Sequence, residues 1–95
     1  MIRVIIERHF RPELEAEAVG LLLEMRGRAM RKPGYVSGET LRSLDDPSVW
    51  LVISNWMDSG VWREWETSPE RRELTGRIES LLTMPEKVSA YSYVR

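Results

Sequence analysis

The segment from residue 45 to residue 72 constrains the fold most, because one hydrophobic period replaces another within it. All four tryptophans of the chain lie there. The centre of the stretch from residue 48 to residue 57, WLVIS, is nearly continuously apolar, which is typical of a β-strand covered on both faces. Further along, Trp62 and Trp65 stand at the spacing of one helix face. The segment therefore predicts a strand that leads into a short helix. Its indoles either fill the core or form the wall of a flat apolar pocket.

The other elements are predicted from the same two periods and from capping residues. Residues 1–10 alternate between an apolar side and a mixed side, as in a strand. The helix that follows has a long apolar stripe, and its early acids and late bases complement the helix dipole. Asp58 or Ser59 is predicted to cap the short helix, and Ser68 and Pro69 stand in the order that favours the start of the next one. The predicted strands cover residues 1–10, 35–44, 48–57 and 87–95, and the predicted helices cover residues 12–31, 58–66 and 68–84.

This order of elements, β-α-β-β-α-β, predicts one ferredoxin-like α+β domain over residues 1–95. Its four strands form an antiparallel sheet with the helices on one face. The third strand is apolar on both sides, with Trp50 and Val52 on one and Leu51 and Ile53 on the other. Helices on one face leave the second apolar face bare, and a second copy packed sheet against sheet is its simplest cover. We therefore expect a homodimer.

Charge and composition exclude several classes of protein. Acidic and basic residues nearly balance, at a net charge of −1, so we expect neither nucleic-acid binding nor membrane binding. Because the chain has no cysteine, it can form no disulfide and cannot use a thiolate in catalysis. The single histidine, His9, rules out a histidine-rich metal site within one subunit, and no metal is expected. The N-terminus is too charged for a signal peptide and no long apolar run exists, so we expect a soluble, cytoplasmic protein.

Four stretches together resemble a known family. They are the early strand running into FRPELEAEA, the turn KPGYVSGETL, the segment WLVISNWMDSGVWREWETSPERREL and the final strand AYSYV. Over essentially its whole length the chain resembles the antibiotic biosynthesis monooxygenase-like (ABM) domains of the dimeric α+β barrel superfamily. The resemblance implies a dimer of ferredoxin-like subunits. It leaves the activity open, because the family includes quinone-forming oxygenases, haem-degrading enzymes and members of unknown role.

The residues of the haem-degrading members are only partly present. Those members use an asparagine on the first strand, a tryptophan in the short helix and a histidine ten residues later. Trp65 matches the tryptophan, whereas Glu7 takes the asparagine position and Thr75 the histidine position. The resemblance therefore does not favour haem degradation by the family's route.

The residues of the quinone-forming members are incomplete as well. Those members use an asparagine in the third strand, a tryptophan at its end and a tyrosine in the short helix. Trp56 matches the tryptophan, whereas Val52 and Trp62 stand at the other two positions. Neither mechanism therefore transfers in full.

The metal-free oxygenases of the family make few demands on the protein. Their phenol or quinol is deprotonated and passes an electron to oxygen itself. The site then needs a flat apolar slot, a base and a group that holds an oxyanion, and the resemblance implies no cofactor. A histidine suits a base near neutrality, whereas a glutamate would need burial to raise its pKa. The candidates are Trp56, Trp62 and Trp65 for the slot, His9 and Glu7 for the base, and Arg3, Asn55 and Tyr91 for oxyanion contacts.

The leading hypothesis is a cofactor-independent monooxygenase acting on a small aromatic compound similar to a phenol or quinol. The alternatives are a non-catalytic ligand-binding or stress-response module and, third, a haem-binding protein. Structural roles are also open to the candidates: the indoles as core, Glu7 paired with an arginine, His9 at the surface and Asn55 bonded within a turn. Arg71 and Arg72 are predicted to form a solvated helix start or a dimer-edge contact, rather than a clamp on the substrate.

Overall fold

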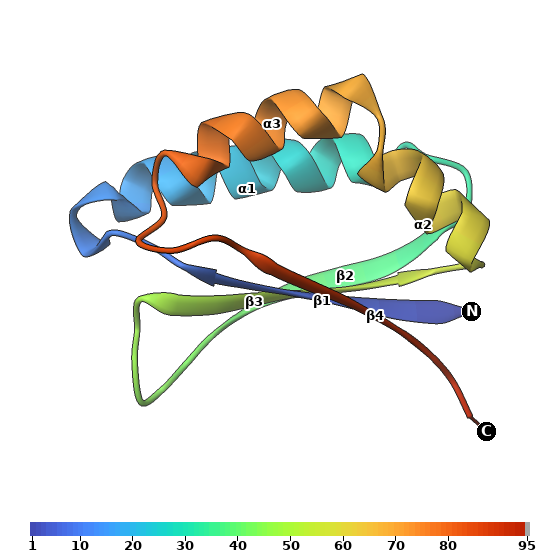
Figure 1. Cartoon of the computed structure of the whole chain (residues 1–95), viewed down its shortest axis with the longest axis horizontal. Coiled ribbons are helices and arrows are strands. Elements are labelled where there is room, and N and C mark those ends of the chain that lie inside the picture. The colour runs from blue at the N-terminus through green and yellow to red at the C-terminus, as the bar shows by residue number, and fades with distance from the viewer. Residues whose placement is uncertain (95) are drawn as a thin grey trace.

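The computed structural model describes residues 1–94, which fold as a four-stranded antiparallel sheet with three α-helices over one face (Figure 1). In space the strands follow the order β2-β3-β1-β4, and each neighbouring pair is antiparallel. The elements are β1 (Ile2–His9), a 3₁₀ turn (Pro12–Leu14), α1 (Glu15–Ala29), β2 (Tyr35–Arg42), β3 (Val49–Trp56), α2 (Ser59–Glu66), α3 (Pro69–Glu79) and β4 (Lys87–Ser92). The predicted ferredoxin-like α+β fold is confirmed.

The two helices after β3 start at the predicted capping residues. The Asp58 carboxylate accepts a hydrogen bond from the backbone N–H of Val61 at 2.9 Å, and α2 begins directly after Asp58. The Ser68 hydroxyl accepts one from the backbone N–H of Arg71 at 3.2 Å, and Pro69 is the first residue of α3. Each cap satisfies an N–H group that has no partner within its helix. The two caps therefore divide this region into two helices, as predicted.

Several predicted elements extend a few residues too far. The first helix begins only at Glu15, because a 3₁₀ turn precedes it. Strand β2 ends at Arg42, where its pairing with β3 stops, and α3 ends at Glu79. Strand β4 ends at Ser92, and Arg95, the last residue of the predicted strand, lies outside the described residues. Hydrophobic periodicity finds an element but does not show where its backbone hydrogen bonds end.

The core lies between the sheet and the helices. Trp56 is 1% exposed, and its ring centroid lies 5.2 Å from that of Tyr35 and 5.6 Å from that of Trp62. Aromatic side chains bury about 150–250 Å² each, so the four buried indoles contribute much of this core. The buried hydrophobic residues are Val4, Ile6, Phe10, Ala18, Leu22, Met25, Ala29, Trp50, Trp56, Trp62, Trp65, Leu74, Ile78, Leu81 and Leu82.

The opposite side of the sheet, here called the open face, has no helix over it (Figure 1). Ile5 lies opposite Ile53 on this face, and Arg3 lies opposite Asn55. Strand β3 was predicted to be covered on both faces, but within one subunit only its helix side is covered.

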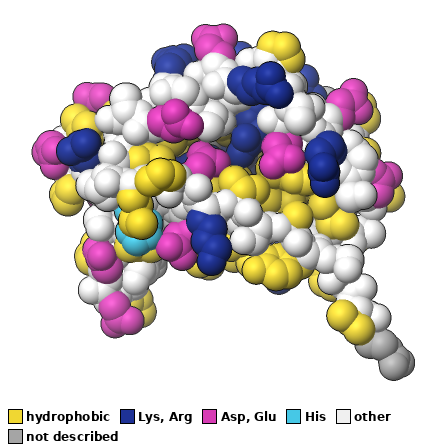
Figure 2. Space-filling view, in the orientation of Figure 1, with side chains coloured by type: hydrophobic (Ala, Val, Ile, Leu, Met, Phe, Trp, Pro, Cys, Tyr) yellow, Lys and Arg dark blue, Asp and Glu magenta, His cyan; other side chains and the backbone are white. Residues whose placement is uncertain are grey.

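Figure 2 shows charged side chains gathered over the helices and hydrophobic side chains along the middle of the molecule. None of the helices within residues 1–94 is long and apolar enough to cross a bilayer.

Candidate functional site

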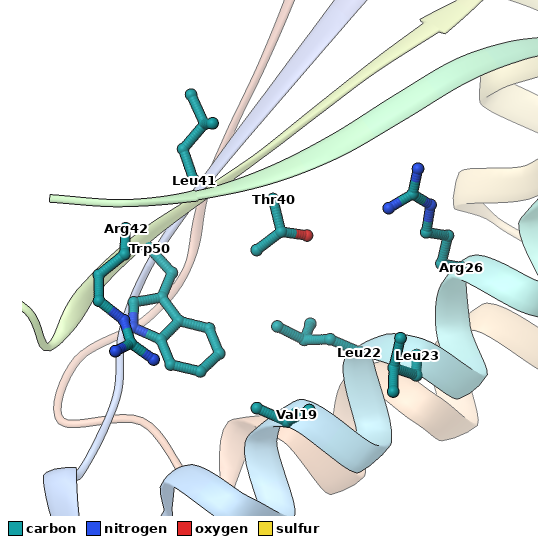
Figure 3. Close-up of a pocket in the computed structure, with 8 residues that line it drawn as sticks. All are labelled: Val19, Leu22, Leu23, Arg26, Thr40, Leu41, Arg42 and Trp50. Carbon is teal, nitrogen blue, oxygen red and sulfur yellow. The ribbon is translucent and has the colours of Figure 1, made fainter.

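A groove of about 320 Å³ runs between α1 and the β2 edge of the sheet, where the helices leave the sheet uncovered (Figure 3). We call it the outer groove. Thr40 and the indole of Trp50 point into it, whereas Leu41 points to the other side of β2. The residues that line it are Val19, Leu22, Leu23 and Arg26 of α1, Thr40, Leu41 and Arg42 of β2, and Trp50 of β3.

A smaller cavity of about 50 Å³, here called the inner recess, adjoins the outer groove beneath the helices. The two spaces share Leu22, Arg26 and Thr40 in their walls. The recess is also lined by indoles of α2 and guanidinium groups of β1 and α3. These side chains are Trp62, Trp65, Arg8 and Arg71. An apolar groove therefore leads from the sheet edge to an aromatic and cationic interior.

Two arginines stand at the sides of the outer groove. Arg26 reaches from α1 to β2, where its Nη2 atom donates a hydrogen bond to the carbonyl of Gly38. Arg42 lies over the ring of Trp50 at 4.8 Å and forms an ion pair with Glu15 at 2.8 Å. Arg26 is the only charged residue that lines both the groove and the recess within the described residues.

The charged residues at the centre of the site are Arg8 and Arg71, which are buried, and Glu86, whose side chain is 11% exposed. Arg8 is 2% exposed and Arg71 is 6% exposed. Their guanidinium groups share the Glu86 carboxylate, at 3.3 Å from Arg8 Nε and 3.5 Å from Arg71 Nη2. The Arg71 guanidinium also lies 5.3 Å from the ring centroid of Trp62. Burial lowers the pKa of Arg8 below its usual value; the Glu86 carboxylate opposes this effect and the neighbouring Arg71 adds to it.

Local sequence explains why both arginines point inward. Arg8 stands on the same side of β1 as Val4 and Ile6, and that side packs against the helices. The Ser68 cap sets the start of α3, so that Arg71 falls on the helix face that also buries Leu74.

Residues 1–76, four-fifths of the chain, match the family model described as antibiotic biosynthesis monooxygenase. The chain belongs to the antibiotic biosynthesis monooxygenase (ABM) family. The resemblance read from the sequence is thereby confirmed. Membership supports a monooxygenase activity and names no substrate.

Individual relatives agree with this assignment. The chain is 28% identical to Protein SchA of Streptomyces halstedii over 78 residues, which is 82% of this chain and 20% of SchA. The chain thus spans about a fifth of the length of the curated relatives that it matches. A Deinococcus radiodurans structure superposes with a TM-score of 0.91 at 17% identity, covering 100% of this chain and 94% of that one. SnoaB from Streptomyces nogalater, a cofactor-independent oxygenase, superposes at 0.88 and 17% identity, covering 99% and 93%. At these identities the structures establish the fold alone.

The eight candidate residues lie on two sides of the ABM sheet. Those on the helix side are Trp56, Trp62 and Trp65. Those on the open face are Arg3, Glu7, His9, Asn55 and Tyr91. The sheet separates the two groups, so within one subunit no single cavity contains them all.

The three helix-side tryptophans differ in role. Trp62 and Trp65 line the inner recess. Trp56 lines neither the recess nor the outer groove; it is fully packed, and its Nε1–H donates to the Ser54 hydroxyl at 3.0 Å. The structure therefore assigns Trp56 to the core and the other two to the cavity wall.

Four of the five open-face candidates form two polar groups, and the fifth, Tyr91, lies opposite Arg3 in the β1–β4 ladder. Asn55 Oδ1 accepts hydrogen bonds from Arg3 Nε at 3.3 Å and from the Tyr93 hydroxyl at 3.1 Å, and Asn55 Nδ2 donates to Ser37 Oγ at 3.0 Å. At the other end of β1, His9 Nε2 lies 2.9 Å from the Glu7 carboxylate. The structural role predicted for Asn55 was a hydrogen bond to the backbone of a turn. Its side chain instead forms hydrogen bonds with three other side chains.

The sequence prediction missed Arg8 and Glu86 and misassigned Arg71. Arg71 was predicted to be solvated but is buried in the cavity wall; its neighbour Arg72 is exposed. Strand alternation could have identified Arg8, which stands between Ile6 and Phe10 on the apolar side of β1. No local signal marks Glu86, which lies in the loop before β4.

The family positions are also clearer in three dimensions. Val52, at the asparagine position of the quinone-forming members, does line the inner recess. Glu7, the residue assigned to the strand position of the haem-degrading members, lies on the open face, whereas Ile6 and Arg8 are the β1 residues that line the recess together with Trp65. Thr75, at their histidine position, has a buried hydroxyl without a hydrogen-bond partner among residues 1–94. Within the same residues no three metal-ligating side chains gather.

Proposed function

We propose that this chain is a cofactor-independent monooxygenase that oxidises a small phenol or quinol bound in the outer groove and inner recess. The observation that carries the proposal is the indole-lined cavity between the helices and the sheet. The outer groove is near the lower end of the size range of ligand sites, about 300–1,000 Å³, which suits a ligand of few rings. Family membership and the likeness to a cofactor-independent oxygenase add support.

The proposed reaction needs only the substrate and dioxygen. Loss of a proton from the substrate leaves an electron-rich anion, which passes one electron to O₂. The two radicals combine to form a C–O bond, and the resulting hydroperoxide loses water. For a ring CH₂ group the balance is CH₂ + O₂ → C=O + H₂O, so one oxygen atom enters the product and the other leaves as water.

The protein's part is to bind and orient the substrate. The indole of Trp50 offers a flat apolar wall for an aromatic ring in the outer groove, and the indoles of Trp62 and Trp65 line the recess that receives the hydroxyl of that ring. The buried guanidinium groups of Arg8 and Arg71 favour the ionised form of a bound hydroxyl, because a nearby positive charge lowers the pKa of an acid. The recess has room for little more than one water molecule, so electrostatic attraction acts strongly within it.

Oxygen uptake by the purified, metal-free protein tests the proposal against a panel of quinols and polyphenols, with autoxidation subtracted. We expect saturable uptake that survives a chelator and falls at least tenfold in Trp62→Phe. Tyr93→Phe is the matched control, because it alters an aromatic ring on the open face. Equal activity of Trp62→Phe and the wild type would refute the cavity assignment.

His9→Gln tests the roles proposed for the open face. If the chemistry takes place on the helix side, this variant keeps its turnover within about twofold of the wild type. A tenfold loss with an intact fold would instead place the Glu7–His9 pair in the reaction, as the sequence prediction has it.

A non-catalytic small-ligand-binding module is the second candidate. No histidine lines the recess within the described residues, so no side chain there has an ordinary pKa suited to a base near neutrality. This candidate predicts ligand-induced quenching of tryptophan fluorescence without oxygen uptake. Haem binding, the third, predicts a Soret band that survives gel filtration, and we expect none.

We also infer a homodimer that packs open face against open face. Ile5, Leu51 and Ile53 place apolar surface at the centre of this face, and Leu41 on β2 is 45% exposed. Apolar surface on the uncovered side of a sheet favours association with a partner, and two-fold symmetry lets one surface serve both subunits.

A further inference from the structure

We propose that Arg8 and Arg71 form an oxyanion-binding subsite, so that the ligand of this cavity is an aromatic compound bearing a carboxylate or an ionised hydroxyl at one end. The proposal deepens the proposed function, since it concerns the same cavity, but it concerns binding and does not require turnover.

The charges of the Arg8–Arg71–Glu86 cluster do not balance. Two guanidinium groups, 2% and 6% exposed, share one carboxylate, that of Glu86. One positive charge therefore remains without a counter-charge inside the cluster. A buried and uncompensated charge is strongly unfavourable, whereas an incoming anion would neutralise it.

The Glu86 carboxylate leaves part of the Arg8 guanidinium group without a partner among residues 1–94. Glu86 contacts the Nε atom of Arg8, and no other residue within 1–94 forms a hydrogen bond with that guanidinium. Arg8 and Arg71 both line the recess, whereas Glu86 is not among the lining residues. The carboxylate thus approaches the cluster from outside the recess. The terminal nitrogens of Arg8 remain available to a ligand, and a planar guanidinium binds carboxylates well.

The other charged residues of the recess do not cancel this charge. Glu39 lines it, but Glu39 lies opposite Ile53 in the β2–β3 ladder, so its side chain belongs to the open face. Arg26 is a further cation at the passage to the outer groove. The interior is therefore cationic on every element that contributes a charged side chain to it.

The sizes of the recess and the outer groove also fit such a ligand. At about 50 Å³ the recess has room for little more than one water molecule, whose share of liquid volume is about 30 Å³. It cannot hold an aromatic ring, but it can hold a carboxylate or a phenolate oxygen. The ring then lies in the outer groove, which is about 320 Å³ and largely apolar. The two spaces together fit a molecule that is apolar at one end and anionic at the other.

Isothermal titration calorimetry with paired probes tests the subsite. The carboxylate pair is 2-naphthoate and 2-naphthamide, and the hydroxyl pair is 2-hydroxy-1,4-naphthoquinone, ionised at neutral pH, and its methyl ether. We expect the wild type to bind the anion of at least one pair tenfold or more tightly than its neutral partner. The pair that shows the preference identifies the kind of oxyanion. Equal affinities within both pairs overturn the proposal without requiring any variant.

Variants separate a binding role from a structural one. Arg8→Met and Arg71→Met should lose the preference for the anion and keep their affinity for the neutral probe, whereas Arg8→Lys should retain part of the preference. Arg72→Met, one residue along α3 and exposed, is the matched control and should bind as the wild type does. Weakening of both probes to the same extent in Arg8→Met would show a merely structural arginine.

Glu86→Gln should change the affinity for the anionic probe in the opposite direction. Without the carboxylate both guanidinium groups are free for the ligand, so affinity for the anion should rise at least threefold while affinity for the neutral probe stays constant. A purely structural cluster predicts no such gain, and a folded Glu86→Gln without it would count against the subsite. If these variants do not fold, the wild-type probe pairs and Arg8→Lys still decide.

The outcome is independent of the proposed oxygenase activity. Anion binding that depends on Arg8, together with no oxygen uptake, would retain the subsite and reject the oxygenase. Oxygen uptake that depends on Trp62, without any anion preference, would do the reverse.

Discussion

The two faces of the sheet are built from alternate residues of the same strands, yet their environments are opposite. Glu7 and Arg8 are neighbours on β1, but the Glu7 side chain is 44% exposed and that of Arg8 is 2% exposed. Asn55 and Trp56 differ in the same way at the end of β3: one joins a polar network on the open face and the other is packed in the core. Because the side-chain period of a strand is two, a shift of one residue changes the environment completely.

The comparison shows where a charged residue is informative. A charge on the open face stays hydrated in the single subunit and needs no special explanation. A buried arginine is strongly disfavoured unless it is paired, and here two arginines share one acid. The helix side therefore holds the residues whose presence calls for a function.

The largest effect is expected from removing an indole of the core. Trp56→Ala should destabilise the fold by about 3–5 kcal/mol, because it removes a fully packed ring. Tyr91→Ala, on the open face and 55% exposed, should cost about 1 kcal/mol or less. Urea unfolding at one fixed protein concentration measures both. Similar losses in the two variants would show that the open face is as firmly packed as the core.

Removing the shared carboxylate should have the next largest effect. Glu86→Gln leaves two buried guanidinium groups unpaired and should cost about 3 kcal/mol in unfolding free energy. The double variant Arg8→Met/Glu86→Gln should be less destabilised than the sum of the two single variants, because it also removes one of the stranded charges. Additive losses in urea unfolding would mean that these groups do not interact.

A charge introduced on the open face should weaken self-association of the protein. Ile53→Glu places a charge at the centre of the proposed dimer surface and should weaken self-association at least 100-fold, or about 2.7 kcal/mol. Met30→Glu, exposed at the end of α1, is the control and should leave association unchanged. Sedimentation equilibrium distinguishes the two results. A wild-type protein that sediments as a monomer contradicts the dimer.

The smallest effect on stability is expected from the Lys32–Glu70 ion pair on the surface of the helices. The hydrogen bond from Lys32 to Glu70, at 2.8 Å, lowers the pKa of Glu70, and the charges of Lys32, Arg28 and Arg31 add to this shift. A depressed folded-state pKa contributes stability above the unfolded-state value, about 4.3, and this contribution is lost as the pH falls through the folded-state pKa.

Lys32→Met should therefore lower the Tm slightly at neutral pH, and the difference from the wild type should shrink below about pH 4. Thermal unfolding between pH 7 and pH 3 measures this change. Glu70→Gln should cause a similar loss, and the two losses should not add. A Tm difference that is constant across this range would show that the ion pair does not stabilise the fold.

The sequence by itself determined the order and type of the elements. The change of period after Trp56, the caps at Asp58 and Ser68, and the alternation of β1 are local features, set by residues within a few positions of one another. The predicted site was less successful because its members were selected by chemical type. That choice grouped His9 and Trp62, which the sheet separates.

Only the tertiary structure decided how the cavity is built. Arg8 lies 78 residues from Glu86 in the chain, and the contact arises because α3 and the loop before β4 pack beside β1. The size of the recess depends in turn on how closely α1 approaches β2. Hydrophobic period and capping act within one element, whereas a buried charge cluster and a cavity depend on how several elements pack together.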